Sequence, residues 1–242
     1  MVHKTIHVGT AGWSLPADQR DHFGAGASIL ARYATRLNAV EINSSFYRPH
    51  RPATYARWAA SVPADFRFAA KVPKAITHER RLVDCDALLE RFLGEAGALG
   101  DKLGPLLVQL PPSLTFDPRI VRIFFAALRS RFGGAVVCEP RHASWFTERA
   151  GEMLVELRIA IAAADPARVL GAERPGGDPG IVYFRWHGSP RIYYSNYESE
   201  RLAALGARLD EARKRGADVW CIFDNTAAGA ATANALEMRE IL

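Results

Sequence analysis

Eight short segments with strand-like patterns recur along the chain, and most are separated by stretches with helical periodicity. The segments are residues 6–9, 39–43, 66–72, 105–110, 135–138, 159–164, 181–186 and 218–223. Strands that alternate with helices favour a parallel sheet, because parallel neighbours need a long crossover connection. Eight such units in 242 residues predict an α/β fold, a TIM-type (β/α)8 barrel.

Helical periodicity places seven helices after or between these strands. Their expected ranges are residues 28–37, 53–61, 85–99, 119–131, 148–157, 199–215 and 226–241. Asp84 is the expected N-cap of the third helix, and Asp117 with Pro118 is a typical opening for the fourth. Residues 166–180 contain three prolines and four glycines, so we expect an irregular connection there between strands six and seven. No linker interrupts the pattern, which predicts one domain over residues 1–242.

Polar residues share one face of several predicted strands, because side chains alternate along a strand. That face carries Glu41, Asn43, Arg67, Lys71, Gln109, Glu139, Arg141, Arg185 and His187. The opposite, apolar face should lie under the helices, so the polar face should point into the barrel. Unpaired charges are costly to bury. Their convergence at the carboxyl ends of the strands indicates a ligand or catalytic site. The alternative is an ion-pair network that closes the barrel mouth.

Residues 135–145 combine a buried strand with a dense set of ionisable groups. Paired carboxylates suit acid/base chemistry or glycoside hydrolysis, and a histidine suits proton transfer. We therefore take Glu139, Glu41 and His187 as candidate catalytic residues. Arginines hold carboxylate or phosphate groups well, and aromatic residues on loops stack on sugars or bases. The candidate substrate-binding residues are Lys71, Arg141, Arg185, Asn43, His142, Gln109, Trp13, Tyr47 and Asn225.

Lys71 allows two interpretations. A lysine with a depressed pKa at the end of a barrel strand can form a Schiff base. Surrounding carboxylates would instead raise its pKa and keep it charged. The sequence favours the second interpretation, in which Lys71 binds an anion.

Bulk composition narrows the function classes. Lys plus Arg is 31 against 26 for Asp plus Glu, a net charge of +5 that fits an anionic ligand or nucleic acid. The three cysteines lack CxxC spacing and no HExxH is present, so we expect no metal and no cofactor. The alternative hypothesis is a divalent metal bound by histidine and carboxylate side chains. No run approaches the ~20 apolar residues of a membrane span, and the first residues do not resemble a signal peptide. We expect a cytoplasmic protein.

Several motifs follow one another in an order that is typical of a known family. They are Gly9-Thr10-Ala11-Gly12-Trp13, Glu41-Ile42-Asn43-Ser44-Ser45-Phe46-Tyr47-Arg48, Lys71 with Thr77-His78, Gln109-Leu110-Pro111-Pro112, Glu139-Pro140-Arg141-His142, Arg185-Trp186-His187-Gly188 and Asn225-Thr226. This pattern resembles the YecE-like family of uncharacterised TIM-barrel proteins (domain of unknown function 72). The resemblance implies a TIM-type barrel and supplies no reaction. The chain departs from the family pattern at Asp224-Asn225, where paired asparagines are usual, and this adds an acid near the site.

The leading hypothesis is an enzyme that acts on a polar or anionic substrate, by hydrolysis or acid/base chemistry, at the C-terminal mouth of the barrel. One alternative is a barrel that binds or processes nucleic acid. Another is a non-catalytic barrel that binds a small ligand.

Overall fold

A computed structural model describes residues 5–242, in which ten strands form two sheets. One sheet has the order β1-β10-β9-β7 and the other β2-β3-β4-β5-β6-β8. All neighbouring strands run parallel except β6 and β8. The strands are β1 (Ile6–Thr10), β2 (Ala39–Ile42), β3 (Arg67–Lys71), β4 (Leu103–Gln109), β5 (Val136–Glu139), β6 (Ala160–Ile161), β7 (Ala163–Asp165), β8 (Gly176–Gly177), β9 (Ile181–Trp186) and β10 (Asp218–Phe223).

The two sheets meet at two seams. At the first, β6 and β7 form one run of chain interrupted at Ala162, so a single segment pairs with β5 and then with β9. At the second, β1 and β2 share a bridge between Ala11 and Glu41. The parallel strands therefore follow one another in the order of a TIM-type fold, although the regular hydrogen-bond ladder ends at these seams.

Tyr33 links β1 to β2 where the ladder is missing. Its hydroxyl accepts from the Thr10 amide at 2.9 Å and donates to the Ala39 carbonyl at 3.0 Å. Gly9 makes this approach possible, because a Cβ there would lie 2.0 Å from the Ala39 oxygen. Burial raises the pKa of Tyr33, so the hydroxyl keeps its proton and can make both bonds.

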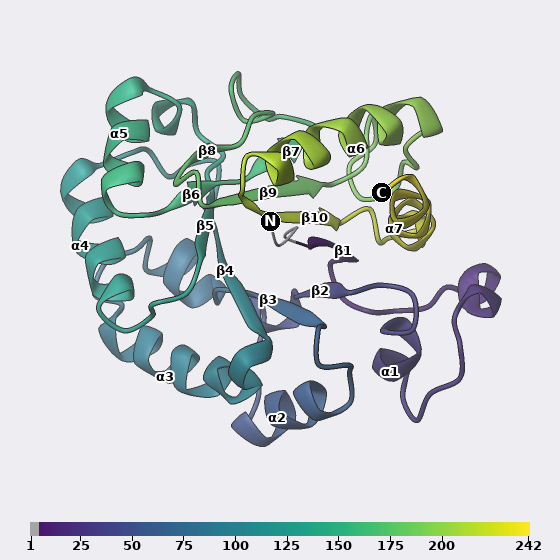
Figure 1. The fold of residues 1–242 in the computed structure, drawn as a ribbon. Helices are drawn as coiled ribbons and strands as arrows, with labels where there is room; N and C mark the ends of the chain where they lie inside the picture. Colours follow the sequence, from purple (N-terminus) through teal and green to yellow (C-terminus); the bar gives the residue numbers. More distant parts are fainter. Residues whose placement is uncertain (1–4) are drawn as a thin grey trace.

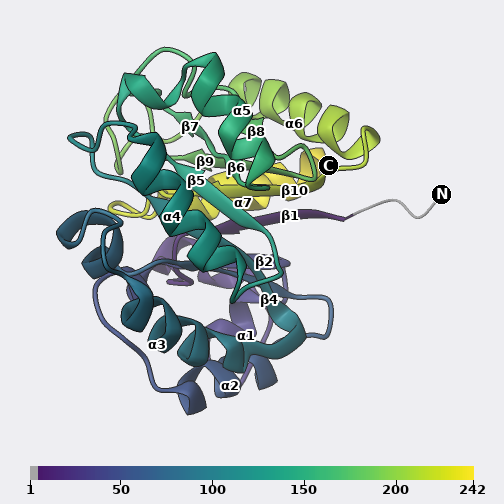
Figure 2. The same ribbon diagram turned by 90° about the vertical axis from the view of Figure 1, so that its left-hand side faces the viewer.

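The helices lie around the outside of the strands (Figures 1 and 2). They are α1 (Ile29–Tyr33), α2 (Pro52–Ala60), α3 (Asp86–Ala96), α4 (Pro118–Arg129), α5 (Glu148–Glu156), α6 (Ser199–Lys214) and α7 (Ala230–Ile241). The predicted opening of α4 is confirmed, since the Asp117 carboxylate accepts from the amides of Arg119 and Ile120.

The structure corrects four details of the predicted helices. Asp84 does not cap α3, because its backbone is left-handed (φ 52°) and Cys85 is the N-cap. The helix predicted for residues 85–99 ends at Ala96 and continues as a 3-10 turn. The helix predicted for residues 226–241 begins only after Gly229 (φ 83°), and α1 is only five residues long. Short local signals misplaced these ends, whereas all seven helices exist.

The segment between β7 and β9 is irregular, as its prolines and glycines predicted. Residues 166–180 contain no helix in the structure. They contribute only the two-residue strand β8, which pairs antiparallel with β6. This short pairing covers the edge of β6, the last parallel strand of the second sheet.

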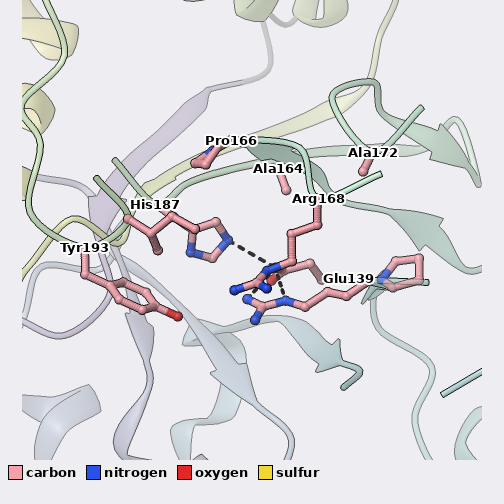
Figure 3. A pocket seen from close by; sticks show the side chains of 10 residues that line it. Glu139, Ala164, Pro166, Arg168, Ala172, His187 and Tyr193 are labelled. Carbon is pink, nitrogen blue, oxygen red and sulfur yellow. Dashed lines mark hydrogen bonds and ion pairs between the residues drawn. The ribbon is translucent and has the colours of Figure 1, made fainter. Parts of the chain in front are cut away.

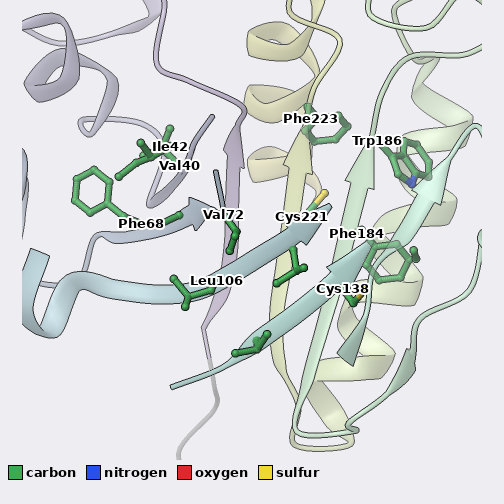
Figure 4. Packing of buried hydrophobic residues seen from close by; sticks show 14 of the residues in the cluster. Val40, Ile42, Phe68, Val72, Leu106, Cys138, Phe184, Trp186, Cys221 and Phe223 are labelled. Atoms are coloured by element: carbon green, nitrogen blue, oxygen red, sulfur yellow. The ribbon is translucent and has the colours of Figure 1, made fainter. Parts of the chain in front are cut away.

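Apolar side chains of one parity fill the layer between the strands and the helices. Figure 4 shows Val40, Ile42, Phe68, Phe184 and Trp186 in this layer, and all five are buried. The predicted assignment of this face is therefore confirmed. Each large side chain buried here contributes roughly 1.5–3 kcal/mol relative to exposure, so the parity is strongly determined by packing.

Side chains of the other parity form a separate cluster inside the ring of strands. Its apolar members come from seven of the strands, from the residue that follows β1 and from the residue between β6 and β7. They are Ala11, Ala39, Ala69, Leu107, Val137, Ala160, Ala162, Ile181, Tyr183, Trp220 and Ile222. Further along the same strands, toward their carboxyl ends, the residues of this parity become charged. Inside the ring of strands, the side chains therefore change from apolar to charged over the length of one strand.

Candidate functional site

The carboxyl ends of the strands bring polar side chains together, as parity predicts. Glu41 is the next-to-last residue of β2, Lys71 is the last residue of β3, and Glu139 is the last residue of β5. Arg185 is the next-to-last residue of β9, and Asp224 directly follows β10. All five are buried. A charged cluster of this size inside a protein requires close pairing.

Arg185 is the central cation of the cluster and has no exposed surface. Its Nε and Nη2 donate to the two carboxylate oxygens of Glu41 at 3.0 and 2.8 Å. Its Nη1 lies 3.2 Å from Glu139 Oε2 and 3.1 Å from Asp224 Oδ2. Burial alone would lower the pKa of Arg185, but Asp224, Glu41 and Glu139 outweigh burial and hold it well above its usual value. Arg185 is therefore a fixed positive charge.

Glu41 is fully enclosed at the floor of the cluster. Besides the two bonds from Arg185, its Oε2 accepts the Tyr183 hydroxyl at 2.9 Å. Burial and the Glu41 carboxylate raise the pKa of Tyr183 well above its usual value, so the phenol stays a donor. Because Glu41 is buried and both its oxygens are occupied, its position suits it to orient Arg185.

Glu139 accepts hydrogen bonds from four side chains. Its Oε1 lies 3.0 Å from Arg141 Nη2 and 3.1 Å from His187 Nε2. Its Oε2 lies 3.1 Å from Gln109 Nε2 and 3.2 Å from Arg185 Nη1. Burial would raise the pKa of Glu139, but Arg141, Arg185 and His187 outweigh burial and hold that pKa well below its usual value. The lowered pKa keeps the carboxylate ionised near neutral pH.

His187 bridges two carboxylates. Its Nδ1 lies 2.9 Å from Asp224 Oδ2 and its Nε2 lies 3.1 Å from Glu139 Oε1. Arg185 Nη1 also lies 3.3 Å from Nδ1, so the ring is enclosed by two carboxylates and a guanidinium. Figure 3 shows the ring pointing toward Glu139 beside a small pocket that Arg141 and Tyr193 also line. The pocket has a volume of only about 10 Å³, so it is no larger than a water site.

A much larger cavity of about 440 Å³ opens beside this cluster. Its lining is rich in polar and aromatic side chains. The residues are Asn43, Phe46, Tyr47, Lys71, His78, Gln109, Tyr193, Tyr194, Asp224, Thr226 and Ala227. This volume falls within the range of small-molecule sites.

Lys71 is a buried cation in the wall of this cavity. Its side chain is 4% exposed. Within residues 5–242 its Nζ has one hydrogen-bond acceptor, Asn43 Oδ1 at 3.0 Å, and it also lies 4.3 Å from the centre of the Phe46 ring. Burial and Arg185 lower the pKa of Lys71 to about 8, although Glu41, Glu139 and Asp224 act against this shift. Donor capacity is therefore left for a ligand.

His78 and Asp224 are two further ionisable groups in the cavity wall. His78 Nδ1 lies 2.8 Å from the Thr77 hydroxyl, and burial with the positive charges of Lys71 and Arg141 lowers its pKa. It is therefore neutral near pH 7. Burial would raise the pKa of Asp224, but Arg185 and His187 hold it below its usual value. A neutral imidazole and an ionised carboxylate thus face one cavity.

Comparison with known proteins decides the family. The family model described as "Protein of unknown function DUF72" matches residues 7–242. The chain belongs to the DUF72 family. A curated relative, the UPF0759 protein YecE of Escherichia coli K12, is 34% identical over 146 residues. That match covers 59% of this chain and 51% of the relative, so the chain spans about half the length of the curated relative.

Solved structures support the fold of this DUF72 chain. A DUF72 family protein from Enterococcus faecalis V583 has a TM-score of 0.83 at 23% identity, over 98% of this chain and 95% of that one. A xylose isomerase-like TIM barrel/4-hydroxyphenylpyruvate dioxygenase fusion protein has a TM-score of 0.54 at 16% identity, over 98% of this chain and 42% of that one. The fold is TIM-barrel-like, and the likeness carries no reaction.

Five residues predicted from the sequence to bind substrate lie outside the lining of the large cavity. Arg141 and Arg185 belong to the ionic cluster, and Arg141 also lines the small pocket. Trp13 packs edge-on against Trp58 with 5.0 Å between the rings. His142 accepts from the Ser144 amide and caps a short turn. Asn225 donates to the Ser195 carbonyl at 2.9 Å, which braces the loop before α6. Tyr47, by contrast, lines the cavity although it is 66% exposed.

Sequence reasoning left four nearby residues out of the candidate set. Tyr183 lies on the same strand face as Arg185, but nothing in the sequence indicated that its hydroxyl would donate to Glu41. Asp224 follows directly on a strand and was noted only as a departure from the family pattern. His78 and Tyr193 lie on loops, in a five-residue π-helical turn (Ala75–Glu79) and at a left-handed backbone (φ 71°), where strand parity gives no signal.

Two further features of the described chain bear on the predictions. Among residues 5–242, no group of three or more His, Cys, Asp and Glu side chains is arranged to hold a metal ion. In the same range, no helix combines the length and the apolar character needed to cross a bilayer.

Proposed function

We propose that this DUF72 chain is an enzyme that acts on a polar, anionic substrate in the mouth cavity by acid/base chemistry. The observation that carries the proposal is the position of Lys71, a buried amine with one hydrogen-bond acceptor, in the wall of a cavity of about 440 Å³. A buried cation with unfilled donors is costly to the fold, so a ligand is the natural source of the missing partners.

The pairing of charges around the cavity supports an anionic ligand. Arg141 and Arg185 make direct ion pairs with the carboxylates of Glu41, Glu139 and Asp224. Lys71 has no such carboxylate partner within residues 5–242, so a negative group on a substrate would supply one. Lys71 and the Asn43 amide are the donors that would receive it.

We assign the catalytic roles from the side chains that line the cavity and from the hydrogen bonds that each already makes. His78 is neutral near pH 7 and suits a general base, while the Asp224 carboxylate suits a second proton-exchanging group. Glu139 and His187, two of the three candidate catalytic residues from the sequence, line the small pocket and not the large cavity. Glu41 is a positioning residue, because its oxygens are held by Arg185 and Tyr183.

A thermal-shift screen with carboxylated and phosphorylated metabolites tests the proposal. We expect at least one anion to raise the melting temperature of the wild type at low salt and to be consumed on incubation. Lys71→Met should abolish the shift. Lys74→Met is the matched control, since Lys74 is partly exposed, pairs with Glu79 at 3.3 Å and lies outside the cavity lining. An anion that stabilises all three proteins equally would contradict the proposal.

The two alternative functions considered from the sequence, a non-catalytic ligand-binding barrel and a nucleic-acid-binding barrel, can each be tested by a separate measurement. A non-catalytic barrel would bind the anion and leave it unchanged, and Asp224→Asn would then have no turnover to lower. A nucleic-acid-binding barrel would bind oligonucleotides at low salt and release them steeply as salt rises, because counterion release dominates such affinity. No oligonucleotide binding at low salt would remove that alternative.

A further inference from the structure

We infer that Lys71 forms an imine with its substrate, and that the substrate is an aldehyde or ketone bearing an acidic group. This inference rests on the proposed function and names the substrate class of the same cavity. The geometry points to it through three features: an amine in the cavity wall, a single neutral acceptor on that amine, and proton-exchanging groups in the same wall.

The immediate surroundings of the amine favour nucleophilic attack. No carboxylate lies within ion-pair distance of Lys71 Nζ in residues 5–242, and its one acceptor is the neutral amide oxygen of Asn43. The nearby charges act at longer range: Arg185 lowers the pKa of Lys71, and Glu41, Glu139 and Asp224 raise it. A deprotonated amine keeps a lone pair that no direct salt bridge blocks.

The step balances without any further reactant. His78 accepts a proton from the Lys71 ammonium, and the amine lone pair attacks the carbonyl carbon to form a C–N bond. The carbonyl π electrons move to oxygen, which takes the proton held by His78 and gives a carbinolamine whose nitrogen still carries two protons. One of these nitrogen protons passes to the same oxygen by way of the Asp224 carboxylate. The C–O bond then breaks, water leaves, and the nitrogen lone pair forms the C=N bond of a protonated imine. Neither oxidant nor reductant is required.

The rest of the cavity wall matches a carbonyl compound with an acidic arm. Tyr193, Tyr194 and Thr226 line the cavity, and a hydroxyl is the kind of group that can donate to a carbonyl oxygen. Asn43 accepts from Lys71 through Oδ1, which leaves its amide N–H groups for an anionic group. Tyr193 lines both the cavity and the small pocket that contains Arg141, so an acidic arm would lie between two cations.

Reductive trapping tests the inference on the intact chain. The protein is incubated with pyruvate or acetone and sodium cyanoborohydride at pH 8, and the adducts are mapped by peptide mass spectrometry. The chain has five lysines (Lys4, Lys71, Lys74, Lys102 and Lys214), so assignment is direct. We expect pyruvate to label Lys71 at least tenfold faster than Lys74. Acetone, which lacks the carboxylate, should label Lys71 at least fivefold more slowly than pyruvate does.

Variants and pH provide the controls. Lys71→Arg should remove the adduct, and Lys74→Arg should keep it; if Lys71→Arg fails to fold, the wild-type map still decides. Labelling of Lys71 should increase from pH 6 to pH 9 with a midpoint near 8, the value to which its pKa is lowered. Equal labelling of all lysines, or no label on Lys71, would overturn the inference. If an anion still binds in a Lys71-dependent way without trapping, the inference fails and the proposed function stands.

Discussion

The two buried cations of the barrel mouth have opposite surroundings. Arg185, at the floor, lies against three carboxylates and makes a two-bond contact with Glu41. Lys71, in the wall, has one neutral acceptor and an aromatic ring. Both are almost fully buried, at 0% and 4% exposure. Pairing outweighs burial for Arg185 and raises its pKa, whereas burial outweighs the nearby carboxylates for Lys71 and lowers its pKa.

This difference separates a structural charge from a functional one. Within the fold, Arg185 pairs with three carboxylates, and it therefore stabilises the arrangement of the strand ends. Lys71 has a single hydrogen-bond acceptor and lies beside a cavity. Its burial therefore costs stability, and a bound ligand can offset that cost. The floor of the mouth should therefore respond to mutation through stability, and the wall through ligand binding.

Arg185→Met should have the largest effect on folding. It leaves Glu41, Glu139 and Asp224 buried without their shared cation, and breaking a buried pair typically costs about 3–5 kcal/mol. Urea unfolding measures the loss of free energy. The exposed pair of Arg122 and Glu156 provides a control, and Arg122→Met should leave the unfolding midpoint nearly unchanged. Equal effects of the two variants would show that the floor is not a structural unit.

Glu139→Gln should have the next largest effect, about 2–3 kcal/mol of destabilisation. A glutamine keeps the shape but turns one oxygen into an NH2 group, which must then face an N–H donor, because both Glu139 oxygens accept from side chains. Chemical unfolding at neutral pH checks the loss. Unchanged stability would contradict the four-donor arrangement.

The same variant has a defined pH signature. The pKa of Glu139 is lowered in the folded protein, so the stability it contributes is present above the pKa of an unfolded carboxyl, about 4, and is lost as pH falls further. Wild-type stability should therefore fall more steeply than that of Glu139→Gln on acidification below pH 4. Asp224, whose pKa is also lowered, supplies the acid sensitivity that remains in the variant.

Lys71→Met should have the smallest effect and the opposite sign, a gain of about 1–3 kcal/mol at pH 7. It removes a charge whose burial exceeds its pairing and fills the space with an apolar chain. The folded pKa lies near 8 and the usual value is 10.5, so the cost of the charge should shrink as pH rises through this window. The gap between variant and wild type should narrow accordingly. If Lys71→Met destabilised the protein, Lys71 would be a cation that stabilises the fold, as Arg185 is.

Much of the fold was predictable because packing determines it. Strand parity assigned Phe184 and Trp186 to the layer beneath the helices, since a shift of one residue would place charged side chains against the helices and turn the rings into the ring of strands. Helix ends were less predictable. Asp84 has the chemistry of an N-cap, yet its backbone is left-handed, and this depends on the turn around it rather than on its own identity.

The site was predictable only where strands supply it. Parity brought Glu41, Glu139, Arg185 and His187 to one place, because strand geometry fixes the direction of each side chain. It did not separate the enclosed Glu41 from Lys71 in the cavity wall, since depth and partners depend on side chains from other strands. The expectation that carboxylates raise the pKa of Lys71 was wrong in its net result, because burial has the larger effect.

The pKa of Lys71 tests the central claim most directly. Lysine labelled with 13C at Cε can be followed by NMR from pH 6 to pH 12, and Lys71→Arg identifies its signal among the five lysines. The account predicts a midpoint near 8 for Lys71. The exposed Lys214 serves as an internal reference for a lysine in contact with solvent. A midpoint for Lys71 at or above 10.5, the ordinary value, would mean that its charge is as well partnered as that of Arg185, and would contradict the account.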